Sequence, residues 1–474
     1  MVLAGLLVWR FLAARDAGLN LSVDEAQYFL WSLEPAWGYF SKPPLIAWTI
    51  AASTSLCGDS EACIRMPALL LFAASAWIIA ALTAQLFDPR TGMWAGIAFA
   101  TLFFTSFYSW AMTTDSILLF LWSLALLLFL RAIEFNRWGD WIALGGAVGL
   151  GLFAKYSMGL FIGCAFAVLW LDHRRHLASA KPWLAALLAL AFLIPNVLWN
   201  LDHQFATWRH TAEIAQLDRK LFHPDSLASF VLAQFVIMNP LMMLALIVAA
   251  ADRAAWRSDP RHRLMALFSL PVLGLFLLLS LLSRAHANWA APAYVAATVL
   301  AVSMLLRRRH MHWLVWAIIL NLLMAATLYH WHRIAPSIGI PLGKGTDPFH
   351  PVRGGWESTG HQLAENLRAT GCRTVAAADR GTLVKLAYYG RRAINSPVAA
   401  LAYNPNGLVR NHFELTADIS QRQFDCAILV GNFDASYLRQ EFVEFAELAP
   451  LNTPQTVLPA WRVSGFKAYA DRSR

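Results

Sequence analysis

Long apolar runs separated by short polar loops occupy the first two thirds of the chain. A helix that crosses about 30 Å of hydrocarbon needs about 20 mostly apolar residues. Eleven runs meet or approach this length, and the first of them is short and carries Arg10. The predicted spans are 1–15, 62–86, 91–109, 114–131, 139–156, 158–172, 181–199, 226–250, 262–283, 286–306 and 312–332. The pattern therefore predicts a polytopic α-helical membrane protein with about 11 spans.

The composition supports this interpretation. Hydrophobic residues make up 58% of the 474 residues and charged residues 14%, whereas soluble domains average ~45–50% and ~25%. So few charges cannot cover a soluble fold of this length, and a disordered chain or a disulfide-rich miniprotein is excluded as well. The formal net charge of +9 is then better explained by membrane topology than by a nucleic-acid partner.

Charged loop residues predict the orientation, because basic loops remain in the cytoplasm. Thirteen basic residues fall on one alternating set of loops: Arg90, Arg131, Arg137, Arg174, Arg175, Lys181, Arg253, Arg257, Arg261, Arg263, Arg307, Arg308 and Arg309. The other set is acidic or mixed and carries Asp24, Glu25, Asp59, Glu61, Asp115, Asp202 and Asp218. The predicted outer segments are 16–61, 110–113, 200–225, 284–285 and the chain after 332.

The chain changes character after His332, where charge density becomes ordinary and no apolar span follows. Short β-like runs alternate with helix-like runs, which predicts a small α/β domain on the outer face. The strands are expected at Thr374–Ala378 and Cys426–Val430, and the helices at Ser358–Thr370, Gly381–Tyr389 and Ser436–Glu447. We thus expect a transmembrane domain over 1–332, including the outer loop 16–61, and an outer domain over 333–474.

Four of the five cysteines lie in predicted outer segments, and Cys164 lies alone in a span. The four are Cys57, Cys63, Cys372 and Cys426. The sequence allows either two disulfides in an oxidising compartment or five unpaired thiols. Pairing requires Cα atoms within ~7 Å, and the sequence alone does not give these distances.

The first outer loop concentrates the polar chemistry. Asp24 and Glu25 begin a stretch in which Tyr28, Phe29 and Leu33 recur at helical spacing. The motif that follows is Trp37-Gly38-Tyr39-Phe40-Ser41-Lys42-Pro43-Pro44-Leu45. It leads into a second amphipathic stretch, and two short helices in the plane of the interface are predicted. The acidic pair either stabilises a helix dipole or takes part in chemistry.

Two further groups of residues are predicted at the same face. Asp115 begins the fourth span, where it either caps the helix or supplies a second carboxylate for acid–base or metal chemistry. Cations suited to a lipid phosphate are Lys42, Arg209 and His210, with His203 nearby, whereas Lys155 is better explained as a membrane anchor.

The start of the tenth span combines polar and aromatic groups in the way that is typical of sugar sites. These residues are His286, Asn288, Trp289 and Tyr294, with Arg284 just before them. Motifs for nucleotide hydrolysis or redox cofactors do not occur, and the spans show no inverted repeat of the transporter kind. A divalent metal ion is left as a candidate cofactor, with His203 as a candidate ligand.

Together these motifs resemble the GT-C glycosyltransferases. They are Asp24-Glu25, Gly38-Tyr39-Phe40-Ser41-Lys42-Pro43-Pro44-Leu45, Thr114-Asp115-Ser116 and the stretch His286–Tyr294. Within this superfamily the chain is similar to the bacterial protein O-mannosyltransferase-like group (family 39) and to the lipid A aminoarabinose transferases (family 83). The resemblance covers about 1–330 and is densest over 20–120. Ser41 stands where aminoarabinose transferases usually carry Glu.

The resemblance implies an inverting membrane glycosyltransferase of the bacterial inner membrane that works on the periplasmic face. It would move one sugar from a polyprenyl-phosphate donor to an envelope acceptor such as lipid A or lipopolysaccharide, a glycan or a protein. Asp24, with Glu25 beside it, corresponds to the catalytic acid or base, Tyr39 and Lys42 to the donor phosphate site, and Asp115 to a second acidic motif. The rival readings are a lipid flippase or transporter, and an oligosaccharide ligase or polymerase.

Overall fold

The computed structural model describes residues 1–215 and 222–471, so the predicted outer residue Asp218 lies outside the described residues. The chain packs into two units. Unit 1 contains Met1–Ala17, Lys42–Ile46 and Arg65–Pro348, and unit 2 contains Gly18–Ser41, Ala47–Ile64 and Phe349–Arg474. Most of the first outer loop therefore packs with the C-terminal part of the chain, and the units do not follow the predicted boundary at 332 and 333.

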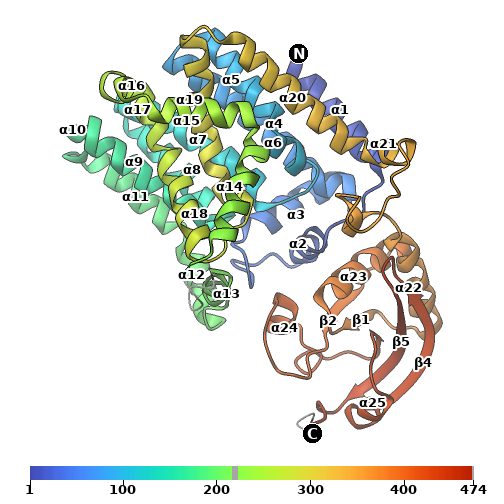
Figure 1. The fold of residues 1–474 in the computed structure, drawn as a ribbon. Helices are drawn as coiled ribbons and strands as arrows, with labels where there is room; N and C mark the ends of the chain where they lie inside the picture. Colours follow the sequence, from blue (N-terminus) through green and yellow to red (C-terminus); the bar gives the residue numbers. More distant parts are fainter. Residues whose placement is uncertain (216–221, 472–474) are drawn as a thin grey trace. The chain divides into compact units, whose positions relative to one another are not determined.

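Unit 1 consists of helices, drawn in blue to orange in Figure 1. In chain order they are α1 (Val2–Ala17), most of α4 (Glu61–Leu86), α5 (Pro89–Thr101), α6 (Phe103–Tyr108), α7 (Thr114–Phe135), α8 (Trp138–Ala154), η1 (Tyr156–Met158), α9 (Gly159–Asp172), α10 (Arg174–Leu177), α11 (Ala180–Ala191), α12 (Ile194–Asp202), α13 (Ala206–Ala215), α14 (Pro224–Met238), α15 (Pro240–Ala251), α16 (Arg253–Ser258), α17 (Pro260–Leu267), α18 (Leu270–Leu282), η2 (Ala287–Ala290), α19 (Ala291–Arg307), α20 (Met311–Tyr329) and α21 (Trp331–Ser337).

Every predicted apolar run falls on a helix, but the predicted count of eleven spans is not confirmed. Among the described residues, six helices are long and apolar enough to cross a membrane. They are Glu61–Leu86, Thr114–Phe135, Ala180–Asp202, Pro260–Leu282, Ala287–Arg307 and Met311–Tyr329. Helices α14 and α15 pass the same test as one pair bent by 107°. The other predicted runs form shorter helices.

The bend between α14 and α15 has a local cause at Asn239. Its φ of 76° lies in a region that side chains other than Gly rarely adopt. The Asn239 amide donates to the Ala317 carbonyl at 3.0 Å and to Asn321 Oδ1 at 3.1 Å, and its oxygen accepts from Leu241 N at 2.8 Å. These bonds satisfy a backbone donor at the break and hold it against α20.

Arg10 donates hydrogen bonds at a second helix break, the one between α5 and α6. It is 3% exposed and donates from Nη2 to the Ala100 carbonyl at 2.5 Å and to Ser106 Oγ at 3.1 Å. Leu102 separates α5 from α6 with extended backbone, so carbonyls at the end of α5 lack intrahelical partners. The charge in the first predicted span thus joins α1 to this break.

Within unit 1, Asp115 and the basic loop residues lie at opposite ends of the helices. Helix α7 has 22 residues, which is roughly 33 Å at about 1.5 Å per residue. Asp115 is at its start, next to Asn288 before α19, whereas Arg131 and Arg307 are near the ends of α7 and α19. This separation agrees with the predicted alternation of acidic and basic loops.

Unit 2 contains a five-stranded sheet in the order β2-β1-β3-β5-β4. The strands are β1 (Thr374–Ala377), β2 (Ala399–Ala402), β3 (Ala427–Val430), β4 (Phe442–Asn452) and β5 (Val457–Phe466). Strand β1 pairs in parallel with β2 and β3, whereas β5 pairs antiparallel with β3 and β4. The helices are α2 (Val23–Leu33), most of α3 (Leu45–Cys57), η3 (His350–Val352), α22 (Trp356–Thr370), α23 (Arg380–Ile394), α24 (His412–Thr416) and α25 (Ala435–Glu441). The α/β prediction is confirmed, and both short helices of the first outer loop are present. Their location in the plane of the interface stays a prediction.

The predicted helix Ser436–Glu447 is wrong in its second half. Helix α25 ends at Glu441 and β4 begins at Phe442. The reason is antiparallel pairing with β5, which extends from Phe442 opposite Phe466 to Asn452 opposite Val457, with a shift in register between Leu448 and Leu451. The local pattern fits either structure, and the partner strand decides between them.

Both cysteine pairs form disulfides, Cys57 with Cys63 and Cys372 with Cys426, and Cys164 is free and buried. We expect the variant Cys372→Ser/Cys426→Ser to lose about 2–4 kcal/mol of stability, because this bridge constrains a long segment of the unfolded chain. The variant Cys57→Ser/Cys63→Ser should lose less, since its cysteines are only 6 residues apart, against 54 for the other pair. Unfolding of both in detergent, followed by intrinsic fluorescence, checks this; equal unfolding midpoints for wild type and the first variant would contradict it.

Candidate functional site

A buried carboxylate lies at the start of α7 in unit 1. Asp115 is 2% exposed, and its Oδ1 accepts from Lys155 Nζ at 2.7 Å while Oδ2 accepts from Asn288 Nδ2 at 2.7 Å. The helix-capping alternative for Asp115 is wrong, because Thr113 is the N-cap residue and no side chain caps this end. The carboxylate instead joins three segments that are distant in sequence.

Lys155 reaches Asp115 because the chain breaks between α8 and η1. Helix α8 ends at Ala154, and Lys155 is extended, with φ −161° and ψ 134°. The turn is tight: a Cβ on Gly151 would lie 2.6 Å from Met158 Cγ. The predicted anchor role of Lys155 is therefore wrong. Its side chain is 18% exposed and ends on a carboxylate, which the sequence pattern of two abutting spans does not reveal.

Several cations surround His286, which precedes η2. Partial burial, followed by the positive charges of Arg284, Lys155 and Lys42, lowers the pKa of His286. The His286 ring also packs edge-on against Trp289, with 5.2 Å between centroids. Lys42 from the first loop and Lys155 thus act electrostatically on His286 at the start of the tenth predicted span.

A cavity of about 560 Å³ adjoins this cluster. His223, Asp225, Arg284 and His286 are its ionisable lining residues, and its size is typical of small-ligand sites. Tyr294 does not line it: this residue is fully buried and its hydroxyl bonds to Gln234, whose Nε2 donates to the Ala287 carbonyl at 3.2 Å. Tyr294 supports η2 from within the bundle, and a substrate-binding role for it stays a prediction.

Helix α13 carries the predicted cations Arg209 and His210. It is joined to the break at Lys155 through Tyr156, whose hydroxyl donates to Asn196 Oδ1 at 2.6 Å. Asn200, one turn further along α12, accepts from Thr207 N at 3.2 Å. The same turn that presents Lys155 therefore positions the helix of Arg209 and His210, whose phosphate role stays a prediction.

The described residues do not offer a metal site. No group of three or more His, Cys, Asp or Glu side chains suited to a metal ion occurs among them. His203 Nδ1 lies 2.8 Å from the Trp199 carbonyl, and its ring stacks on Trp199 at 4.0 Å. Its role as a metal ligand stays a prediction, and we derive no step through a metal.

Helix α2 in unit 2 carries the first acidic motif. Ser22 and Glu25 form a capping box: Ser22 Oγ accepts from Glu25 N at 3.2 Å and Glu25 Oε2 accepts from Ser22 N at 2.9 Å. Glu25 is 1% exposed, so for this residue the helix-stabilising alternative is confirmed. Asp24, in the same turn, has a side chain that is 59% exposed.

Arg380 from the start of α23 holds Asp24. Its Nη1 lies 3.1 Å from Asp24 Oδ1 and 3.0 Å from Gln27 Oε1. Sequence reasoning missed Arg380 because it lies more than 350 residues away in a segment without a recognised motif. The pairing leaves a half-exposed carboxylate with a fixed orientation.

Tyr39 is buried beside α2. Its hydroxyl donates to the Trp31 carbonyl at 3.0 Å and accepts from Ala36 N at 3.0 Å, and its ring stacks on Trp31 at 4.4 Å. Burial raises the pKa of Tyr39 to about 12, so the phenol stays protonated at neutral pH. It shapes the turn that leads to Lys42, and its phosphate-binding role stays a prediction.

The chain is similar to known proteins in both sequence and structure. Residues 41–199 match the family model described as dolichyl-phosphate-mannose-protein mannosyltransferase. The structure of ArnT from Cupriavidus metallidurans bound to undecaprenyl phosphate superposes with a TM-score of 0.64, at 14% identity and over 97% of both chains. The chain has the fold of the GT-C glycosyltransferases. The predicted GT-C resemblance is confirmed.

Two curated proteins similar to this chain come from Rhizobium johnstonii. The lipid A galacturonosyltransferase RgtD is 34% identical over 308 residues, which are 64% of this chain and 65% of RgtD. The lipopolysaccharide core galacturonosyltransferase RgtA is 28% identical over 184 residues, which are 38% of this chain and 37% of RgtA. Each alignment spans less than two thirds of the relative.

The Asp115–Lys155 pair yields a stability prediction. We expect Lys155→Gln to cost about 3–5 kcal/mol, because it leaves a buried carboxylate without its ionic partner. The double variant Asp115→Asn/Lys155→Gln should recover part of that loss, since no buried charge remains. Lys181→Gln is the control: Lys181 Nζ donates to the exposed Asn136 carbonyl and lies over the Trp138 ring at 5.6 Å, and it does not pair with a buried carboxylate. Thermal unfolding in detergent measures all three, and equal losses for Lys155→Gln and Lys181→Gln would contradict the ion-pair argument.

Proposed function

We propose that the protein transfers one sugar from a polyprenyl-phosphate donor to a lipid A-type or other glycolipid acceptor on the outer face of the bacterial inner membrane. The observation that carries this is the cationic cluster of Lys42, Lys155 and Arg284 around His286, beside a cavity of about 560 Å³. A phosphate at a membrane edge is bound by such charges. The printed activity of RgtD and the undecaprenyl phosphate bound to ArnT support the same substrate classes.

We propose galacturonic acid as the sugar. Both curated relatives are named galacturonosyltransferases, and a uronic acid on a phosphate carrier brings two negative groups. The basic residues Lys42, Lys155 and Arg284 outnumber the carboxylates Asp115 and Asp225 of the cluster and the cavity lining, so the net charge of this region is positive. A neutral or cationic sugar would gain nothing from that excess.

The reaction follows from these groups. The acceptor hydroxyl oxygen forms a bond to the anomeric carbon as the bond from that carbon to the phosphate oxygen breaks. Asp24 accepts the hydroxyl proton as the new bond forms, and the ion pair with Arg380 holds its carboxylate in orientation. Lys42 stabilises the charge that develops on the departing polyprenyl phosphate. Inversion is the expected outcome, since a single displacement occurs.

Rival functions make different demands on the chain. A flippase needs charged groups on a path across the bilayer, whereas the charges around His286 gather at one end of the helices. A ligase or polymerase uses the same carrier but moves an oligosaccharide. The products of a transfer assay with a defined donor separate these functions.

We expect purified protein to transfer one labelled galacturonic acid from its polyprenyl-phosphate carrier to lipid A, and Asp24→Asn to slow this transfer about 10²–10⁴-fold, the usual contribution of a general base. Mass spectrometry of the product measures it, with Asp16→Asn as the carboxylate control, because Asp16 pairs with Arg333 and His332 instead. Near-normal turnover of Asp24→Asn would sink the catalytic assignment. Equal use of a mannose donor would contradict the choice of sugar alone.

Lys42→Ala should chiefly weaken donor binding. A charge-assisted hydrogen bond contributes about 1.5–3 kcal/mol, so we expect roughly 10–100-fold lower affinity for the polyprenyl-phosphate sugar. Equilibrium binding of labelled donor measures this, and Lys344→Ala, an exposed lysine elsewhere in unit 1, is the matched control. Unchanged donor affinity in the Lys42→Ala variant would show that Lys42 does not bind the donor phosphate.

A further inference from the structure

A second polar cavity lies in unit 1 at the far end of α19 from His286. Its volume is about 620 Å³, and it opens among the start of α5, the start of α17 and the end of α19. This is the end that carries the predicted cytoplasmic arginines. None of its lining residues belongs to the cluster around Asp115.

Arginine dominates the charge of this cavity. Arg90, Arg261, Arg307 and Arg309 line it together with two carboxylates. Both carboxylates already serve as helix caps. Asp88 accepts from the first backbone amides of α5 at 2.9 and 3.0 Å, and Asp259 accepts from the Arg261 backbone and side chain at 3.0 and 3.1 Å. The lining therefore carries a surplus of positive charge.

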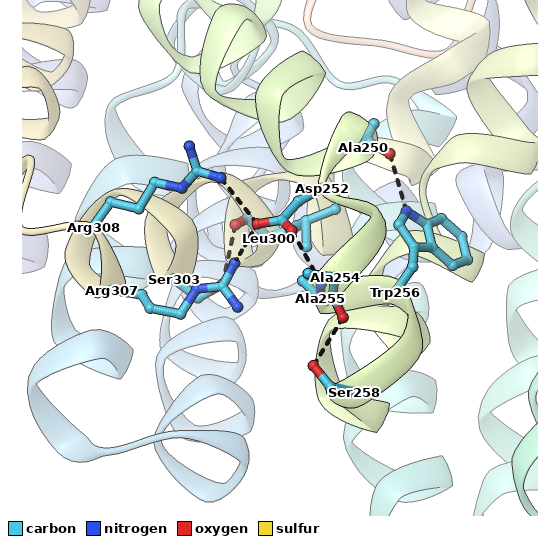
Figure 2. Close-up of polar contacts among 10 residues, drawn as sticks. All are labelled: Ala250, Asp252, Ala254, Ala255, Trp256, Ser258, Leu300, Ser303, Arg307 and Arg308. Carbon is cyan, nitrogen blue, oxygen red and sulfur yellow. Dashed lines mark hydrogen bonds and ion pairs between the residues drawn. The ribbon is translucent and has the colours of Figure 1, made fainter.

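Two of the four arginines are fixed by neighbours and two are not. Arg261 pairs with Asp259 and lies over the Phe87 ring at 5.0 Å. Figure 2 shows Arg307 and Arg308 converging on Asp252, at 3.1 and 3.0 Å. In the described part of the chain, the guanidinium groups of Arg90 and Arg309 have no ion pair or hydrogen bond with a side chain or carbonyl.

A buried histidine in the same wall lacks a partner. His262 lines the cavity, is 3% exposed, and its Nε2 has no hydrogen bond among the described residues. A buried polar atom without a partner is costly, and a bound ligand with a polar group would satisfy it.

We propose that this cavity binds a phosphate-bearing anion, for which Arg90 and Arg309 supply the positive charge and His262 Nε2 supplies a third polar contact. Basic pockets between transmembrane helices on the cytoplasmic side are the kind that bind anionic lipid headgroups. Leu306 and Met311 in the same lining offer apolar surface beside the charges. The ligand comes either from a lipid headgroup or from free phosphate, and the experiment distinguishes the two.

The test uses the full-length protein in nanodiscs of phosphatidylcholine with and without phosphatidylglycerol, and native mass spectrometry to count retained lipids. Arg90→Gln/Arg309→Gln should bind phosphatidylglycerol roughly tenfold more weakly or worse, since each arginine near an anionic headgroup contributes to affinity. His262→Phe should weaken retention while it keeps the volume of the ring. Arg253→Gln/Arg257→Gln removes two exposed arginines at the same end that do not line the cavity, and it should retain lipid like the wild type.

The possible results of this test distinguish a lipid headgroup from free phosphate, and both from the absence of a site. Lipid retention that is lost in the first two variants, and that millimolar inorganic phosphate does not displace, identifies a headgroup site. Saturable binding of inorganic phosphate that depends on the same residues identifies free phosphate as the ligand. Equal retention of lipid and phosphate by wild type and Arg90→Gln/Arg309→Gln, or an equal loss in the control variant, overturns the proposal. A normal size-exclusion profile for each variant shows that folding is intact.

Discussion

The buried contact of Asp115 with Lys155 and Asn288 is the interaction on which the end of unit 1 near His286 depends. A carboxylate 2% exposed is tolerable only if both oxygens are paired, and here each has a partner at 2.7 Å. Because those partners come from the break after α8 and the start of η2, satisfying one charge fixes three segments together. This arrangement therefore positions Lys155 and the start of η2, which directly follows His286.

In unit 2, contacts between the region of α2 and the C-terminal segment have a comparable role. Tyr389 bonds to the Leu21 amide at 2.8 Å and to the Glu61 carboxylate, and Arg380 bonds to Asp24 and Gln27. The first acidic motif is therefore built from the beginning and the end of the chain. The C-terminal segment, which carries no recognised motif, supplies the groups that orient the motif-bearing helix.

Much of the fold was predictable because long apolar runs form helices in a membrane, so each predicted span falls on one helix or on two consecutive helices. The helix breaks were harder to predict from the sequence. The bend at Asn239 depends on hydrogen bonds to α20, which is distant in sequence. The helix predicted over Ser436–Glu447 failed for the same reason at β4. In the site, Asp115 and Asn288 were predicted from their motifs, whereas Lys155 and Arg380 were not, since only the folded chain brings each beside a carboxylate.

The division of the chain into units has a consequence for biosynthesis. The segments Gly18–Ser41 and Ala47–Ile64 belong to unit 2, but the rest of that unit begins at Phe349. At about 5–20 residues per second, the intervening stretch takes roughly 15–60 s to synthesise. During that interval α2 and α3 have left the ribosome, and α2 lacks α23, the helix it packs against. Their amphipathic surfaces must rest on the membrane or a chaperone until translation ends, while the short bridge between Cys57 and Cys63 can already close.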